Sequence, residues 1–165
     1  MPPRRGPLKN EDLDAVIAAV LRATPAFVGV ALRSLAAAGV DVTLAQYRML
    51  AVLDREAGRN VRDLAARLGV ERSTATRMCD RLVRAHLIER RTDPSDRRAV
   101  AISLTAEGHE VVAKVTTARR AIVAELLRPL PPDRRQQLVG LLDEFAGLVE
   151  RNPGPEGPAE RPRSV

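Results

Sequence analysis

The chain has 165 residues, enough for one domain with its own hydrophobic core. Hydrophobic residues make up 45% of it, which excludes a wholly disordered chain, and aromatic residues only 2%, which leaves alanine, leucine and valine to build the core. The formal net charge of +6 favours an acidic partner, either nucleic acid or an anionic membrane surface. Twelve arginines and seven acids lie between Arg55 and Arg98, so the central segment holds most of the excess positive charge.

Several classes of protein are disfavoured by residues that the chain lacks. Cys79 is the only cysteine, so no intramolecular disulfide can form, which is typical of a reducing cytosol. We see neither an apolar run that approaches a membrane span nor a signal peptide, and expect a cytoplasmic protein without membrane contact. Cys79, His86 and His109 do not form a convincing metal site, and no nucleophile–base pair or phosphate-binding glycine loop is found. We therefore expect no enzyme, no metal and no other cofactor.

Both ends of the chain are rich in proline. Residues 1–9 predict a disordered basic arm and residues 152–165 a disordered tail, which leaves one folded unit over residues 10–151. Its first long helical pattern covers residues 10–38 and ends at Gly39. Pro25 removes a backbone hydrogen bond there, so we expect this helix to kink or split near Ala23–Thr24.

Three shorter helices are predicted next. Thr43 and Gln46 match a capping box and open a helix that runs to about Glu56. Helical segments over 61–68 and 71–85 follow, joined by a short turn at Gly69. Two short helices in this layout indicate a helix-turn-helix, whose second helix enters the major groove of DNA.

The second helix of this motif has one apolar and one polar face. Its apolar face holds Cys79, which predicts a buried structural thiol. Arg77, on the polar face, is long enough for a bidentate contact to guanine. An ordinary solvated helix face is the alternative, because helix-turn-helix patterns also recur by chance. The candidate DNA-binding residues of this face are Arg72, Ser73, Thr74, Thr76, Arg77 and Arg81.

The pattern then changes from a helical to a two-residue period. Residues 87–91 and 100–104 predict a β-hairpin whose arginine-rich tip includes Arg97 and Arg98. Thr105 caps a long helix that runs to Arg128, where prolines stop it. A last helix is predicted from Pro132 to about Glu150.

The motifs together resemble the MarR family of winged-helix regulators. The similar stretches are TLAQYRML, VRDLAARLGVERSTATRMCDRLVRAHLIERR and DPSDRRAVAISLTAEG. The last matches the family's wing signature, Asp-x-Arg-x-x-x-apolar-x-Leu-Thr, from Asp96 to Thr105. The resemblance implies a mainly α fold with a small β-hairpin: a winged helix-turn-helix lobe (43–104), dimerisation helices (10–38 and 130–150) and a linking helix (105–128).

The resemblance also implies a function. It implies a homodimer that binds double-stranded DNA at a pseudo-palindromic operator, as a ligand-responsive repressor. Arg98 would reach the minor groove with Asp96 holding its guanidinium. A plain hairpin ion pair is the alternative, and the minor-groove role is favoured because a partnered arginine at a hairpin tip is preorganised for a narrow, negative groove. A protein-interaction adaptor that keeps the fold but does not bind DNA is the alternative. Arg77 and Arg98, which an adaptor need not keep, are both present.

Two further expectations concern particular residues. The family usually has glycine at position 86, just past the recognition helix, and His86 stands there in this chain, so we expect a positive φ at His86. Phe27 and Tyr47 are two of the few aromatic residues, and we expect them to line a pocket for a small aromatic effector near the start of the long helix. Plain core packing of both rings is the alternative.

Overall fold

The computed structural model describes residues 10–92 and 100–152. In these residues the elements are, in order, α1 (Asn10–Ala38), α2 (Leu44–Arg55), α3 (Val61–Leu68), α4 (Arg72–Arg84), β1 (Ile88–Thr92), β2 (Val100–Leu104), α5 (Ala106–Leu127) and α6 (Pro132–Arg151). The predicted fold class, mainly α with one small β-hairpin, is confirmed. The arm over 1–9, the hairpin tip over 93–99 and the tail from 153 lie outside the described residues.

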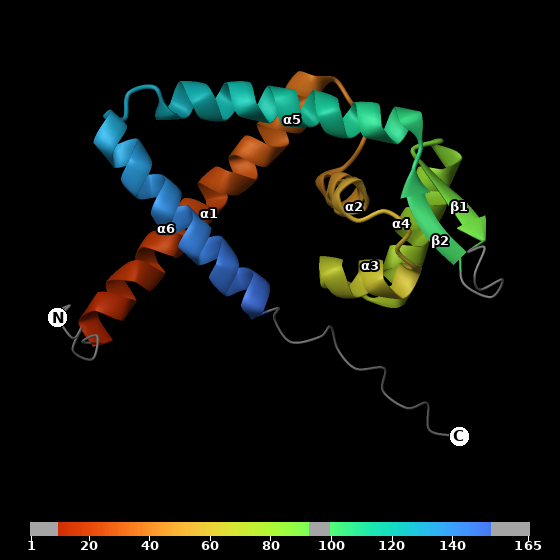
Figure 1. Ribbon diagram of the computed structural model, residues 1–165, viewed down its shortest axis with the longest axis horizontal. Helices are drawn as coiled ribbons and strands as arrows, with labels where there is room; N and C mark the ends of the chain where they lie inside the picture. Colours follow the sequence, from red (N-terminus) through yellow and green to blue (C-terminus); the bar gives the residue numbers. More distant parts are fainter. Residues whose placement is uncertain (1–9, 93–99, 153–165) are drawn as a thin grey trace.

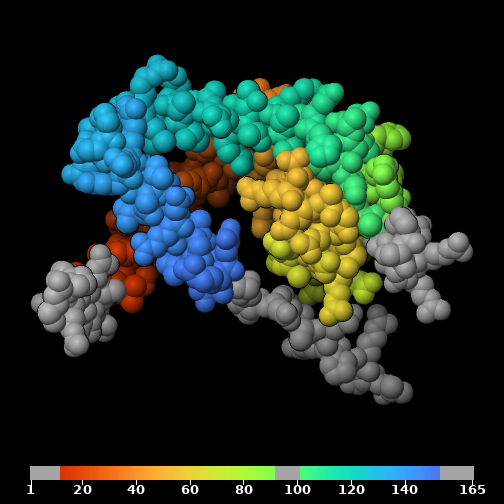
Figure 2. Space-filling model, in the orientation of Figure 1, coloured from red at the N-terminus to blue at the C-terminus, as the bar shows by residue number. Residues whose placement is uncertain are grey.

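Helix α5 is the long member that joins the two parts of the molecule (Figure 1). One part is a lobe of α2, α3, α4 and the hairpin, which lies beside the first half of α5. The other part is formed by α1, which packs along α5, and by α6, which turns back from the far end of α5. The space-filling view shows an opening bounded by α5, α6 and the lobe (Figure 2).

The helix boundaries follow from local capping. The Thr43 side chain accepts a hydrogen bond from the Gln46 amide at 3.2 Å, and the Gln46 side chain accepts one from the Thr43 amide at 2.8 Å, as predicted. Asn60 caps α3 by accepting from the Asp63 amide at 2.9 Å. Gly69 ends α3 with φ 65°, a left-handed conformation that glycine adopts without strain. Gly69 thereby sets the short turn between α3 and α4.

The main hydrophobic core lies inside the lobe. Its fully buried side chains come from α2, α3, α4, both strands and the first half of α5, which packs the hairpin and the helix-turn-helix into one body. A smaller cluster of Leu35, Tyr47 and Val115 joins the end of α1 to α2 and α5. Helix α6 has no buried residue at all in the described protomer.

The wing is an antiparallel hairpin with a third short partner. Arg90 pairs with Ile102 across the two strands, and Ile88 pairs with Leu104. A backbone bridge from the loop before α3 adds to the edge of β2: the Ile102 amide donates to the Arg59 carbonyl at 2.8 Å, and the Gly58 amide to the Ile102 carbonyl at 3.1 Å. The hairpin is thereby attached to the loop that leads into the helix-turn-helix.

Two expectations concern α1. The helix was expected to kink or split near Ala23–Thr24, and it does not split but continues through Pro25 from Asn10 to Ala38. Helix propagation is cooperative, so one missing hydrogen bond does not end a helix of 29 residues. The expectation that no apolar run approaches a membrane span is wrong, because the segment Asp12–Ala38 is long and apolar enough to cross a membrane by length and composition alone. This run is hard to see in the sequence, because many alanines separate its larger apolar residues. Alanine is itself apolar and uncharged, so the mean hydropathy stays high.

Candidate nucleic-acid interface

Helix α4 presents a polar face outside the lobe. Ala75, Cys79 and Leu82 are buried in the core, so the helix cannot rotate without exposing them. The opposite side chains then lie in solvent: Arg72, Ser73, Arg77 and Arg81 are exposed, and Thr74 and Thr76 are half-buried. The structure therefore brings the six candidate residues of this helix to one surface.

The hydroxyl groups of this face differ in their availability. Thr76 donates its hydroxyl proton to the Arg72 carbonyl at 2.9 Å, so only its lone pairs are left for a partner. Thr74 accepts a long contact of 3.4 Å from the Arg77 guanidinium. Ser73 has no hydrogen bond recorded within the described part of the chain and is exposed. Arg77 and Ser73 are thus freer to meet a ligand than Thr76.

The first turn of α4 is open to an anion. Glu71 occupies the N-cap position, but its side chain caps no amide. The Thr74 and Ala75 amides already donate to the Glu71 carbonyl, which leaves the amides of Arg72 and Ser73 directed out of the helix end. Free amides at a positive helix end favour a phosphate group.

The recognition helix passes into the wing through a strained residue. His86 has φ 56°, which confirms the expected left-handed conformation. The Leu87 amide donates to the Leu82 carbonyl at 3.0 Å, and the Thr105 hydroxyl donates to the His86 carbonyl at 2.7 Å. The Thr105 oxygen also accepts from the Gly108 amide at 3.0 Å, so one side chain caps α5 and fixes the start of the wing.

The wing carries basic residues besides those expected to contact DNA. Arg90 and Arg91 lie on β1 and are exposed, and each is paired with an acid. Arg90 contacts Asp80 of α4 at 2.6 Å, and Arg91 contacts Glu89 on its own strand at 2.6 Å. The run of charged residues after Ile88 was the signal in the sequence. The predicted wing-tip residues Asp96, Arg97 and Arg98 lie outside the described residues.

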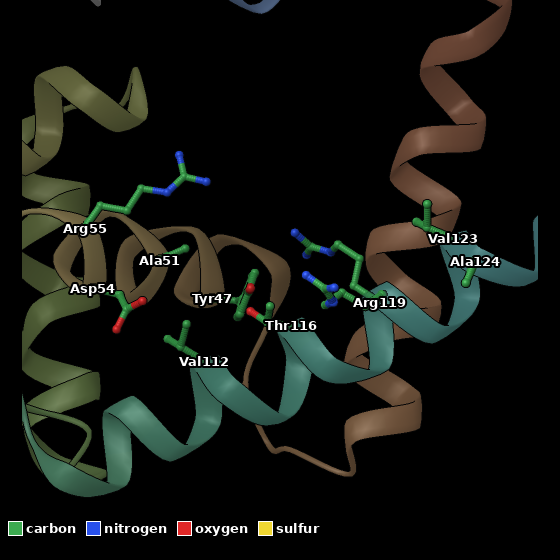
Figure 3. Close-up of a pocket in the computed structure, with 10 residues that line it drawn as sticks. Tyr47, Ala51, Asp54, Arg55, Val112, Thr116, Arg119, Val123 and Ala124 are labelled. Atoms are coloured by element: carbon green, nitrogen blue, oxygen red, sulfur yellow. The ribbon is translucent and has the colours of Figure 1, made fainter. Parts of the chain in front are cut away.

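A groove lies between α2 and the middle of α5 (Figure 3). It has a volume of about 520 Å³, and its lining includes Tyr47 and Ala51 from α2 and Val112 and Arg119 from α5. A second hollow of about 590 Å³ shares Tyr47 and Arg119 and is bordered by Phe27, which is 63% exposed. The expected residues therefore lie at hollows, but along the middle of α5 and not at its start.

Arg119 is the unusual residue of this groove. Its guanidinium carbon lies 5.1 Å from the centroid of the Tyr47 ring, a cation–π distance. Its Nε is buried and has no hydrogen-bond partner within the described residues. Tyr47 itself is buried under this side chain. The stacking covers the one aromatic ring that reaches both hollows.

Cys79 behaves as a packing residue. It is fully buried, and its sulfur lies 3.6 Å from the Met49 sulfur. Burial raises the pKa of the Cys79 thiol above its ordinary value, an effect that nearby Arg90 only partly opposes. Within residues 10–92 and 100–152, no three His, Cys, Asp or Glu side chains come together as a metal site would require.

Comparisons with known proteins agree with this geometry. A family model described as the MarR family matches residues 40–99. The chain is 35% identical to the HTH-type transcriptional repressor MdtR of Bacillus subtilis, over 66% of this chain and 70% of that protein. Among solved structures, RV1404 from Mycobacterium tuberculosis superposes with a TM-score of 0.75 at 34% identity, over 90% of this chain and 97% of that one. Apo MarR from Escherichia coli gives 0.66 at 26% identity, over 78% and 94%. The chain belongs to the MarR family and is a DNA-binding transcriptional regulator.

Proposed function

We propose that the protein is a cytoplasmic repressor that binds a pseudo-palindromic operator as a homodimer and is released by a small aromatic effector. The observation that carries the DNA-binding part is the exposed face of α4, where arginines and a free helix end lie together beside a basic hairpin. Repression is supported by the similarity to MdtR, which is named a repressor.

The dimer is supported by apolar surface that one protomer leaves uncovered. Helix α1 exposes a row of large apolar side chains that includes Leu21 and Leu32, and α6 exposes another that includes Leu141 and Phe145. Soluble monomers rarely expose patches of this size. Two copies that interlock α1 and α6 would cover both rows and place the two α4 helices on one face of the DNA.

A second copy of the chain explains the exposed apolar rows of α1 and α6 better than a membrane does. Helix α1 alone could enter a bilayer by its length and composition. Helix α6 could not, because it carries charged residues such as Arg134, Arg135, Asp143 and Glu144. Only a protein partner accounts for the apolar rows of both helices, which supports a dimer in the cytoplasm without membrane contact.

The DNA contacts divide between the two grooves. Arg77 extends from the exposed side of α4, where a bidentate contact to guanine is within its reach. Arg72 and Ser73, at the open helix end, would hold a phosphate, with Thr74, Thr76 and Arg81 beside them. Arg97 and Arg98 on the wing, with Asp96 orienting Arg98, would enter the minor groove and contribute mainly through charge and groove shape.

A binding titration on the protein's own promoter DNA tests this division. Arg77→Ala should lose roughly 1–3 kcal/mol per half-site and relax the preference at one base position. Arg98→Ala should weaken binding to all sequences and lower the salt dependence, because it removes a charge and reads no base. The matched control is Arg128→Ala, which removes the same charge at the far end of α5 from the lobe (Figure 1).

Two results would contradict the assignment. If Arg98→Ala changed the base preference and Arg77→Ala did not, the groove assignments would be reversed. If neither weakened binding relative to Arg128→Ala, this face would not bind DNA. The adaptor alternative would then be favoured.

The fluorescence of Tyr47 can be used to test whether an effector binds at the proposed site. Tyr47 is the only tyrosine of the chain, which has no tryptophan, so emission excited beyond the phenylalanine absorption band comes from the proposed site. Candidate aromatic acids and phenols should quench or shift this emission and release the operator over the same concentration range. Phe27→Leu should weaken that response. A ligand that releases DNA without changing the Tyr47 signal would place the effector site elsewhere.

A further inference from the structure

One ion pair joins the recognition helix to the wing. The Arg90 guanidinium on β1 lies 2.6 Å from the Asp80 carboxylate on α4, and their side chains are 40% and 45% exposed. Asp80 lies on the polar side of α4, between Arg77 and Arg81. The pair therefore sits at the surface where the proposed interface passes from helix to hairpin.

Because Arg90 lies on the hairpin and Asp80 on α4, their ion pair holds the two elements together. We call this ion pair the strut. Arg90 pairs across the hairpin with Ile102, which is fully buried in the lobe core. Its side chain points back to α4, ten residues earlier in the chain. At the root of the hairpin, the backbone already turns through His86. The ion pair adds a connection at the surface, farther along β1, to the core packing of Ile88 and Ile102 and the backbone bridge from Arg59.

We propose that Asp80 and Arg90 are positioning residues that set the wing relative to the recognition helix for simultaneous contact with both grooves. This rests on the proposed DNA-binding face. An exposed ion pair contributes little to folding stability. It can still matter for binding, because a hairpin held in place loses less freedom when DNA fixes it.

The proposal and the change in charge alone predict opposite effects of Asp80→Asn on DNA affinity. Asp80→Asn removes a negative charge from a surface that meets phosphates, so simple electrostatics predicts tighter binding with a steeper salt dependence. Loss of the strut predicts weaker binding in spite of the added charge. A third possibility is that Asp80 accepts a hydrogen bond from a cytosine amino group, which would appear as a change at one base position.

The experiment compares variants on the same promoter DNA at two salt concentrations. They are Asp80→Asn, Asp80→Glu, Arg90→Gln, the double variant Asp80→Asn with Arg90→Gln, and the controls Glu89→Gln and Arg77→Ala. Glu89 contacts Arg91 on its own strand at 2.6 Å, so the control removes an acid from the wing without separating two elements. Melting temperatures are measured alongside, to show that every variant folds.

The expected result is a loss of affinity for Asp80→Asn of roughly five-fold or more, with the melting temperature unchanged. The double variant should bind no more weakly than Arg90→Gln alone, because the strut is already lost and Asp80→Asn then only removes a negative charge, but it should stay below wild-type affinity. Glu89→Gln should bind as well as the wild type or better. Asp80→Glu, which keeps the carboxylate, should restore most of the affinity.

Three results would overturn the proposal. The first is Asp80→Asn binding as tightly as the wild type or more tightly. The second is a double variant that returns to wild-type affinity, as two cancelling charges would. The third is a base preference that changes with Asp80→Asn but not with Arg90→Gln. An Arg77→Ala control run in parallel identifies the separate failure in which the whole α4 face does not bind DNA, and that result removes the basis of the strut as well.

Discussion

Gly108 lies where α5 meets the wing, and replacing it with alanine should destabilise the protein. A Cβ built at this position would lie 2.1 Å from the Leu87 carbonyl oxygen and 3.3 Å from a Leu104 methyl carbon. The Leu87 oxygen belongs to the backbone and already accepts a hydrogen bond from the Thr105 amide at 3.2 Å. To reach ordinary contact, α5 and the wing root would have to separate by about 1 Å.

The magnitude follows from two opposing effects. Alanine in place of glycine favours a helix by at most about 1 kcal/mol. The overlap with a backbone atom costs about 1–3 kcal/mol, as overpacking in cores does. Separation of the two elements also weakens the hydrogen bond from the Gly108 amide to the Thr105 hydroxyl, a cap typically worth about 1 kcal/mol. The expected balance is a loss of about 2 kcal/mol.

Chemical and thermal unfolding at one fixed protomer concentration measure this loss. For a chain of this size, about 2 kcal/mol lowers the melting temperature by roughly 4–8 °C. Ala113→Gly, at an exposed site of the same helix, gives the propensity effect alone and should cost up to about 1 kcal/mol. A Gly108→Ala variant as stable as the wild type would show that the wing root yields freely, and the reasoning from this contact would be refuted.

Three further changes have expected outcomes. His86→Gly should stabilise the protein by about 1 kcal/mol or less in the same unfolding assay, because glycine adopts φ 56° without strain; a loss of stability would count against this. The Cys79 thiol should not react with a thiolate-specific reagent in the native protein at neutral pH and should react fully in denaturant, since burial raises its pKa; rapid native labelling would show it to be accessible. Phe145→Asp should shift the sedimenting species toward the 18.0 kDa protomer at micromolar concentration, because it places a charge in the exposed apolar row of α6; an unchanged dimer would move the interface away from α6.

Local signals in the sequence predicted most of the elements. Thr43 with Gln46, Gly69 and Thr105 each act within a few residues, and the helices that they bound lie within a residue or two of their expected ends. The positive φ of His86 was also predictable, because it depends only on how a helix turns into a strand. The sequence was therefore sufficient to predict helix ends and backbone conformations that depend on a few neighbouring residues.

Features that depend on distant residues were not predictable in this way. Tyr47 and Arg119 are 72 positions apart, and their stacking follows only from how α5 lies across α2. The contact between Asp80 and Arg90 depends in the same way on the angle between α4 and the hairpin. The continuity of α1 through Pro25 was not predictable for the opposite reason, because the cooperativity of a long helix overrides the local helix-breaking effect of one proline.

The contacts of α5 offer a physical route from the groove to the DNA. At its start, Thr105 holds the wing root through the His86 carbonyl at 2.7 Å. About 20 Å farther along the helix, Arg119 stacks on Tyr47. If the proposed effector separates Arg119 from Tyr47, a tilt of α5 is the way in which that displacement would reach the wing root at Thr105. In a two-fold dimer the two α4 helices must match half-sites about one helical turn apart, and a small tilt in each protomer disturbs that match. Because coupling is reciprocal, such an effector would bind the DNA complex more weakly by the same factor by which it lowers DNA affinity.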